Sequence, residues 1–247
     1  MDFELEICAN SISSALAAQE GGAIRIELCD NMAEGGTTPS AGMISQCKKV
    51  LTIQVFPIIR PRGGDFLYTD EEFEVMKADI LIAKNLGCEG VVVGILKPDG
   101  SIDTERCTEL IATARPMQVT FHRAFDRCNN LEKGLEDIIS LGCERVLTSG
   151  GEINATDAIP VLASIVKQAA GRISIMIGSG VNEENVSDLA RQTGAKQFHS
   201  TAKIPKRSGM AYFGNGNLAR QDGHYPINET SSENVRKMKR ALQLLKT

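Results

Sequence analysis

The sequence predicts an α/β fold, a closed (β/α)8 TIM barrel that forms one domain over residues 1–247. Short β-rich runs alternate with helical stretches about every 30 residues, which is the length of one βα unit. Eight such runs can be counted, and a chain of about 250 residues is typical of this barrel. An open, doubly wound parallel sheet is the second interpretation, although it usually contains fewer strands.

Eight segments have the composition of buried strands. In chain order they are Phe3–Ala9, Ala23–Cys29, Ile53–Arg60, Gly90–Leu96, Met117–Phe125, Arg145–Thr148, Ile173–Ile177 and Lys196–Ser200. A glycine precedes four of them, at positions 22, 87, 142 and 194. Glycine is common just after the last turn of a helix, so each of these residues is expected to end one.

The helical stretches between the strands carry capping signals. Thr69 with Glu72 forms a capping box ahead of an apolar stripe at helical spacing. Asn182 is expected to cap the helix after the seventh strand, and Thr230 with Glu233 to open the last helix. A polar, glycine-rich stretch, residues 203–228, is predicted to be a long loop before that C-terminal helix, and such a loop is either mobile or functional.

Composition excludes several classes of partner. The net charge is −4, and the chain has three Tyr, eight Phe and no Trp, so it lacks the basic surface and stacking rings that bind nucleic acids. No apolar run is long enough for a membrane span, and the acidic N-terminus does not resemble a signal peptide. Seven cysteines without a CxxC pair indicate free thiols in a reducing compartment, and therefore a cytoplasmic protein.

The first two strands alternate strictly between apolar and polar residues. The polar faces carry Glu4, Glu6 and Cys8 on the first strand, and Arg25, Glu27 and Cys29 on the second. In a barrel wrapped by helices the apolar faces meet the helices, so the polar faces are expected to point inward. The pattern Glu-x-Cys then occurs on two neighbouring strands, at matching heights.

Further charged residues follow the third and fifth strands. Arg60 and Arg62 come from the third, and His122 from the fifth, where Arg123 and Asp126 follow it. Because buried charges are costly unless paired, Glu6 and Glu27 are expected to pair with Arg25, Arg60 or Lys196. The cluster is either a structural layer of ion pairs or a site, and its place at the C-terminal ends of the strands favours a site.

Glycine-rich turns follow the sixth and seventh strands, and polar residues end the eighth. Backbone N–H groups at this position bind phosphate in many barrels. We therefore expect an anion site formed by Gly151, Ser179, Gly180 and Thr201. The other interpretation is that these residues only form tight βα turns.

Several motifs together resemble those of one known family. They are Glu6-x-Cys8, Glu27-x-Cys29, and the segments 34–40 (EGGTTPS), 60–68 (RPRGGDFLY), 121–126 (FHRAFD) and 146–151 (VLTSGG). In this order they resemble the CutC family, named for copper homeostasis, and the likeness extends to about residue 213. A leucine at Thr37 and a more glycine-rich turn at Ser179 would match the family better.

The resemblance implies a cytoplasmic, homo-oligomeric TIM barrel that takes part in the control of copper. It makes Cys8 and Cys29 the candidate ligands of copper, and Cu(I) is soft enough to suit two thiolates on adjacent strands. Glu6 and Glu27, by contrast, are hard ligands.

Two functions follow from these patterns. The first is a copper homeostasis protein that binds Cu(I). The second is an enzyme with isomerase or lyase chemistry on a small phosphorylated or anionic molecule, with Glu6 or Glu27 as general acid or base. His122 would then share proton transfer near neutral pH, while Arg60 and Arg62 would hold a carboxylate or a second phosphate. A barrel fold alone does not select between them.

Overall fold

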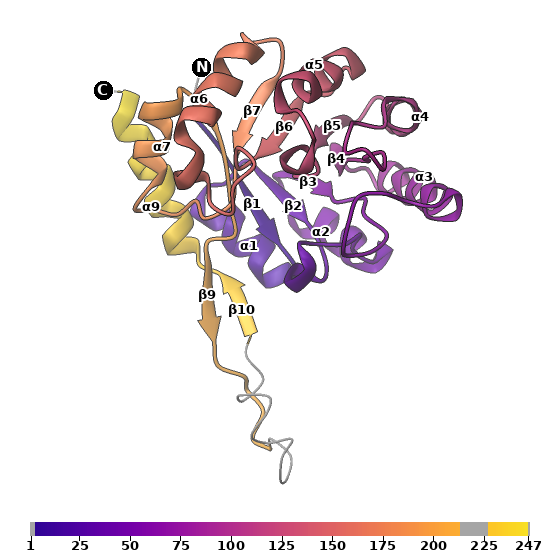
Figure 1. Ribbon diagram of the computed structural model, residues 1–247. Coiled ribbons are helices and arrows are strands. Elements are labelled where there is room, and N and C mark those ends of the chain that lie inside the picture. The colour runs from indigo at the N-terminus through magenta and orange to yellow at the C-terminus, as the bar shows by residue number, and fades with distance from the viewer. Residues whose placement is uncertain (1–2, 213–226, 247) are drawn as a thin grey trace.

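The computed structural model describes residues 3–212 and 227–246, and its core is a nearly closed barrel of eight parallel strands surrounded by helices (Figure 1). The barrel strands are β1 (Glu4–Ala9), β2 (Arg25–Leu28), β3 (Gln54–Pro57), β4 (Gly90–Val93), β5 (Gln118–Phe121), β6 (Arg145–Thr148), β7 (Ser174–Ile177) and β8 (Gln197–Ser200). The helices are α1 (Ile12–Gly21), α2 (Ala41–Val50), α3 (Asp70–Asn85), α4 (Thr104–Ala114), α5 (Leu131–Leu141), α6 (Ile159–Ala169), α7 (Val186–Thr193) and α9 (Ser232–Gln243). In the part of the chain that the structure describes, no helix is long and apolar enough to cross a membrane.

The strand order shows how the barrel closes. The sheet runs β3-β2-β1-β8-β7-β6-β5-β4, so β3 and β4 are its two edges. A parallel bridge between Ile58 and Val92 joins these edges, and the N–H of Ile59 donates to the carbonyl of Val92 at 2.8 Å. The barrel predicted from the sequence is therefore confirmed, and the open-sheet interpretation is wrong.

The element ends follow local capping, with two corrections to the expected caps. The Thr69–Glu72 capping box at the start of α3 is confirmed. Asn185, not Asn182, immediately precedes α7, and the Asn182 side chain accepts from the N–H groups of Glu184 and Asn185 in the turn before it. The last helix begins after Ser231, because Thr230 is held in a strand. The four glycines expected to end helices, at positions 22, 87, 142 and 194, all have positive φ.

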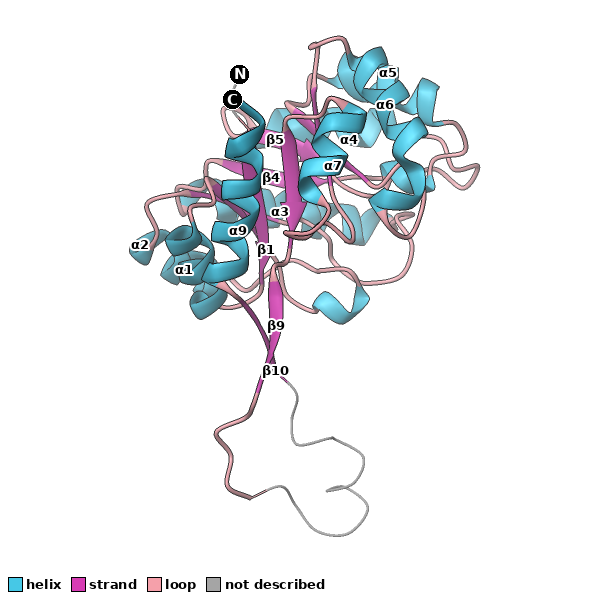
Figure 2. Cartoon of the chain, turned by 90° about the vertical axis from the view of Figure 1, so that its left-hand side faces the viewer, coloured by secondary structure: helices cyan, strands magenta, loops and turns pink. Residues whose placement is uncertain are grey.

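The connection before α9 is more regular than the predicted loop over 203–228. Its two ends form β9 (Lys203–Lys206) and β10 (Ile227–Thr230), which pair antiparallel and extend away from the barrel (Figure 2). The long loop predicted over 203–228 thus has a strand at each end, and its middle, 213–226, lies outside the described residues.

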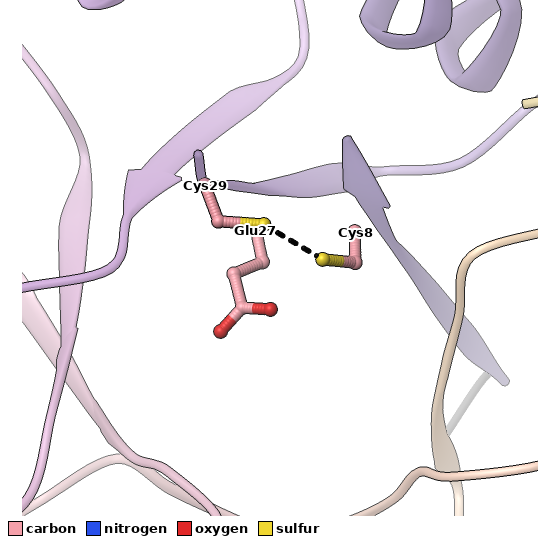
Figure 3. A group of neighbouring side chains, drawn as sticks. All are labelled: Cys8, Glu27 and Cys29. Carbon is pink, nitrogen blue, oxygen red and sulfur yellow. Dashed lines mark hydrogen bonds between the residues drawn. The ribbon is translucent and has the colours of Figure 1, made fainter. Parts of the chain in front are cut away.

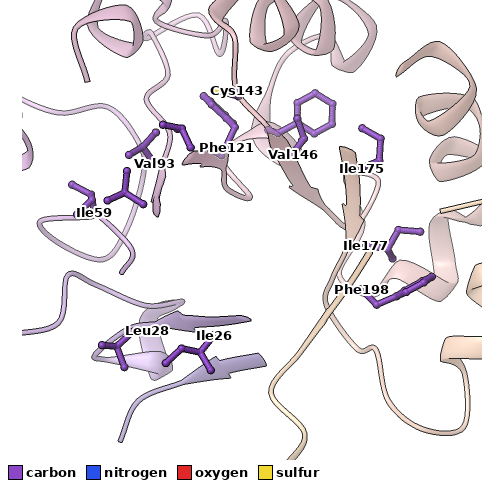
Figure 4. Close-up of a cluster of buried hydrophobic side chains, with 14 of the residues drawn as sticks. Ile26, Leu28, Ile59, Val93, Phe121, Cys143, Val146, Ile175, Ile177 and Phe198 are labelled. Carbon is purple, nitrogen blue, oxygen red and sulfur yellow. The ribbon is translucent and has the colours of Figure 1, made fainter. Parts of the chain in front are cut away.

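The interior has two parts: an apolar core between the strands and the helices, and a region inside the barrel that contains buried charged residues. Between strands and helices lies a large hydrophobic core, part of which Figure 4 shows. Inside the barrel two guanidinium groups lie near the ring centre of Phe56, those of Arg25 (5.2 Å) and Arg145 (5.3 Å). A Cβ at Gly90 would approach this ring to 2.3 Å, so only glycine fits there. The predicted inward polar faces of β1 and β2 are confirmed by the burial of Glu6, Arg25 and Glu27.

Candidate functional site

A cavity of about 590 Å³ opens at the C-terminal ends of the strands. Most of the predicted site residues line it: Cys8, Glu27, Cys29, Arg60, His122, Ser179, Gly180 and Thr201. Three do not, namely Glu6, Arg62 and Gly151. Such a mouth, with polar groups converging from several strands, is where barrels bind small molecules.

Two thiols meet at one wall of this cavity. The Sγ atoms of Cys8 and Cys29 are 2.9 Å apart, both side chains are buried, and both cysteines are free (Figure 3). The carboxylate of Glu27 completes a group in which the ligand atoms all lie within 4.8 Å of one another. The hydrogen bond to Cys29 and burial raise the pKa of the Cys8 thiol well above its ordinary value, so at neutral pH this thiol carries its proton.

The register of β1 and β2 differs from the expected one. Glu6 lies opposite Arg25, and Cys8 opposite Glu27, so the two Glu-x-Cys patterns are shifted by two residues and are not at matching heights. The shift places the second carboxylate next to the first thiol. It also gives Glu6 a cationic neighbour within the barrel.

Buried ionisable groups next to the thiols contact one another in series, from Arg25 through Glu6 and His199 to Glu27. Glu6 forms an ion pair with Arg25, and its other oxygen lies 2.8 Å from Nδ1 of His199. Nε2 of His199 lies 3.5 Å from the carboxylate of Glu27. These contacts hold both carboxylates in fixed positions inside the barrel.

Burial alone would raise the pKa of Glu6, but Arg25 and His199 lower it to about 2. Burial would lower the pKa of His199, but the neighbouring carboxylates of Glu6 and Glu27 outweigh it and raise this pKa. Burial dominates at Glu27 and raises its pKa, although His199 opposes this. Glu6 is thus a fixed anion away from the cavity, which does not suit the predicted role of general acid or base, whereas Glu27 faces the cavity.

Of the three cations expected to pair with these carboxylates, only Arg25 does so. The ammonium of Lys196 lies 4.3 Å from the ring centre of Phe3, and Arg60 hydrogen-bonds to backbone carbonyls. The partner of these carboxylates that was not predicted from the sequence is His199. Two signals could have identified it. Side chains alternate along a strand, so if Phe198 faces the helices, His199 faces the interior of the barrel. A closed barrel also brings the eighth strand beside the first.

His122 is held as a neutral imidazole. It is buried, and its Nδ1 accepts from the N–H of Ala124 at 3.1 Å. Burial and the charge of Arg60 lower its pKa to about 3. Proton transfer near neutral pH, as expected from the sequence, does not suit this environment. Gly94 makes room for the ring, since a Cβ there would lie 2.5 Å from it.

The two arginines after β3 have different surroundings. Arg60 is 3% exposed, its guanidinium lies 5.0 Å from the ring centre of Phe66, and it lines the cavity. Arg62 instead pairs with Glu72 at 2.6 Å and with Asp65 at 2.9 Å. The structure therefore places Arg62 outside the expected anion site, because its charge is used to hold the start of α3.

The glycine-rich turn after β6 already holds an anion of the protein itself. The carboxylate of Asp126 accepts from the N–H groups of Ser149 (3.0 Å) and Gly151 (3.1 Å) and from Nε of Arg123 (2.7 Å). The N–H of Gly151, predicted to bind an anion, thus donates to Asp126, and Gly151 does not line the cavity. Ser179, Gly180 and Thr201 do line the cavity, and Ser179 has a φ of 78° where the family resemblance suggests glycine.

The environment of Glu6 should make stability depend on pH. Its pKa of about 2 in the folded chain lies below the ordinary 4.5, so its contribution is complete above pH 4.5 and is lost as the pH falls toward 2. Urea unfolding of the metal-free protein should therefore show a steep loss of stability over this range. Glu6→Gln, which has no such proton, should show a shallower loss; equal slopes for the two proteins would contradict the assignment.

Comparison with known proteins supports the resemblance seen in the sequence. The CutC family model matches residues 3–204. A CutC family protein of Chromobacterium violaceum is 47% identical over 98% of this chain and 99% of its own, and the human copper homeostasis protein cutC homolog is 48% identical over 85% and 77%. The crystal structure of CutC from Streptococcus agalactiae is similar, with a TM-score of 0.78 and 36% identity over 81% of this chain and 98% of that one.

A second group of structures shares only the fold. Phosphoribosylanthranilate isomerase of Thermotoga maritima superimposes with a TM-score of 0.59 over 98% of both chains, at 12% identity. This likeness confirms a TIM barrel and carries no statement about chemistry. The family match spans most of the chain and the relatives match it closely in sequence and structure, so the chain belongs to the CutC family.

Proposed function

We propose that this protein acts in copper homeostasis and binds Cu(I) between the thiols of Cys8 and Cys29. The observation that carries the proposal is the contact of the two Sγ atoms, 2.9 Å apart, at the wall of an open cavity. Cu(I) is a soft ion that prefers thiolates. The names of the human and mouse relatives, copper homeostasis protein cutC homolog, agree with this role.

The surroundings fit a site that takes up and releases its ion as cargo. Metal binding displaces the protons of the two thiols; the carboxyl group of Glu27 lies beside them to receive one, and the other leaves to solvent through the open cavity. Because burial raises the pKa of Glu27, a proton on this group is less costly than on an exposed carboxylate. The group contains one carboxylate, that of Glu27, and two sulfurs. The sulfurs are the ligands that would make the site selective for Cu(I).

The test is the double variant Cys8→Ser/Cys29→Ser, with Cu(I) affinity measured by competition with a chromogenic chelator. We expect tight binding to be abolished, because a hydroxyl is a poor ligand of Cu(I). Cys128→Ser is the matched control, since this half-buried cysteine contacts the carbonyl of Ala124 and not the cavity. Unchanged affinity in the double variant would remove the pair as ligands.

We further propose a cytoplasmic location, a homo-oligomer, and no nucleic-acid or membrane partner. The free cysteines support the location, because thiols persist in a reducing compartment. The net charge of −4 supports the absence of a nucleic-acid partner. The oligomer rests on the family resemblance.

A further inference from the structure

A second feature of the cavity lies outside the thiol pair and concerns the hydrogen-bond donors of Arg60. A guanidinium has five N–H donors. Nη1 donates to the carbonyls of Glu34 (2.8 Å) and Gly36 (2.7 Å), and Nη2 to that of Gly64 (2.8 Å), whereas Nε is buried without a partner. Nε and one hydrogen of Nη2 therefore have no acceptor within hydrogen-bonding distance among the described residues. The Tyr68 hydroxyl, also buried without a partner, lies near enough for Arg60 to lower its pKa, although burial raises that pKa more.

The charge of Arg60 also lacks a carboxylate partner among the residues that the structure describes. The pKa of Asp65 is lowered mainly by Arg62 and less by Arg60. Its side chain is 69% exposed, and its carboxylate pairs with Arg62 at 2.9 Å. Glu27, which shares the cavity, is engaged by His199. Buried charges in proteins are normally paired, so an unpaired guanidinium at a cavity wall indicates a negative group supplied from outside.

His122 adds a second donor on the same side of the cavity. Since Nδ1 accepts a hydrogen bond from Ala124, the neutral ring carries its proton on Nε2, and this buried atom also has no partner. The two side chains are joined through Phe66, whose ring centre lies 4.9 Å from the imidazole centre and 5.0 Å from the guanidinium carbon of Arg60. All three residues line the cavity.

We propose that Arg60 and His122 form a binding site for the oxyanion of a small organic molecule, a carboxylate or phosphate group. An oxyanion accepts hydrogen bonds and is itself negative, so it satisfies the unused donors and the unpaired charge together. A cation would meet only donors, and an apolar group would leave all of them unsatisfied. The cavity of about 590 Å³ leaves room for the rest of the molecule.

The site uses residues other than the proposed copper ligands, within the same cavity. Its residues follow β3 and β5, whereas Cys8 and Cys29 lie on and just after β1 and β2. It is also separate from the glycine-rich turn after β6, whose N–H groups hold Asp126. The expected occupant is therefore a metabolite with a negatively charged group, bound beside the thiols, since a Cβ at Gly36, whose carbonyl accepts from Arg60, would lie 3.3 Å from Cβ of Cys29.

The test titrates the ¹⁵N-labelled full chain with sodium phosphate and, separately, with sodium succinate, and follows the N–H signals of Arg60 Nε and His122 Nε2 by NMR. We expect saturable shifts of both signals with at least one anion, and the anion that binds identifies the group. Arg60→Gln and His122→Phe should each weaken this binding by at least about tenfold, because each removes a hydrogen bond to a charged group.

Matched variants separate binding from folding and from copper. Arg62→Gln, changed in the same loop but outside the cavity, should bind the anion as the wild type does. If Arg60→Gln loosens the loops whose carbonyls it holds, His122→Phe keeps an aromatic ring and still removes the donor. Cys8→Ser/Cys29→Ser should keep anion binding, and His122→Phe should keep Cu(I) binding. Saturation by neither anion, or equal affinity in wild type and His122→Phe, would overturn the proposal.

Discussion

Replacing Glu6 by alanine is expected to lower the free energy of unfolding by about 3 to 5 kcal/mol, because it removes one partner of a buried ion pair and leaves the other uncompensated. Arg25 is fully buried and its guanidinium pairs with Glu6, while His199 donates to the second oxygen of the same carboxylate. Urea unfolding at neutral pH, followed by circular dichroism, measures the loss.

Glu4→Ala is the matched control on the same strand. Its carboxylate lies 3.8 Å from Nη1 of Arg25, but the side chain is 38% exposed, so the pair is solvated. Exposed pairs contribute about 0 to 1 kcal/mol, and the control should lose no more than that. Similar losses in Glu6→Ala and Glu4→Ala would show that the interior of the barrel is more hydrated than the buried contacts indicate.

Asp126→Ala should destabilise the protein by about 3 kcal/mol or more, since charge-assisted hydrogen bonds contribute about 1.5 to 3 kcal/mol each and are not fully additive. The side chain is 3% exposed and accepts from the backbone of Ser149 and Gly151, from the hydroxyl of Thr148, and from Arg123. Its removal leaves these donors unpaired at the end of β6. Hydrogen exchange at the two backbone amides should increase along with the loss of stability.

Asp157→Ala serves as the control for this change. Asp157 is an exposed carboxylate in the short helix that follows the same turn, and its side chain accepts from Asn154. We expect a change within about 0.5 kcal/mol, as for most surface substitutions. If Asp126→Ala were equally mild, the turn would hold its shape through backbone geometry alone, and Gly151 would again be available to a ligand.

Much of the fold could be predicted because it depends on local periodicity. Alternation in Phe3–Ala9 and Ala23–Cys29 separates an apolar face for the helices from a polar face for the interior, and the structure confirms both. The glycines before strands and the capping box at Thr69 are equally local signals. The pairing of Lys203–Lys206 with Ile227–Thr230 is not local, and its polar composition resembles that of a loop.

The charged interior was harder to predict, because it depends on register and on which strands become neighbours. A shift of two residues between β1 and β2 pairs Glu6 with Arg25, and no feature of either strand alone determines it. His199 enters the network only because the barrel closes β8 against β1. Proximity in space decides these partners, whereas the sequence shows only which faces are polar.

Arg60 and Arg62 illustrate the same limit within one motif. They are two residues apart in a glycine-rich segment, and the sequence assigns both to anion binding. The backbone directs Arg62 toward Glu72 on α3. The guanidinium of Arg60 instead donates to loop carbonyls and contacts the ring of Phe66. Composition identifies the charges, but the path of the loop determines which one remains available.

The junction at which the barrel closes lies beside the proposed anion site. Seven of the eight junctions between neighbouring strands are paired ladders, whereas β3 and β4 meet at the isolated bridge between Ile58 and Val92. Arg60 follows one side of this seam, and His122, packed against Gly94, lies beyond the other. A molecule that contacts both Arg60 and His122 would therefore bridge the junction at which the barrel strands share the fewest hydrogen bonds.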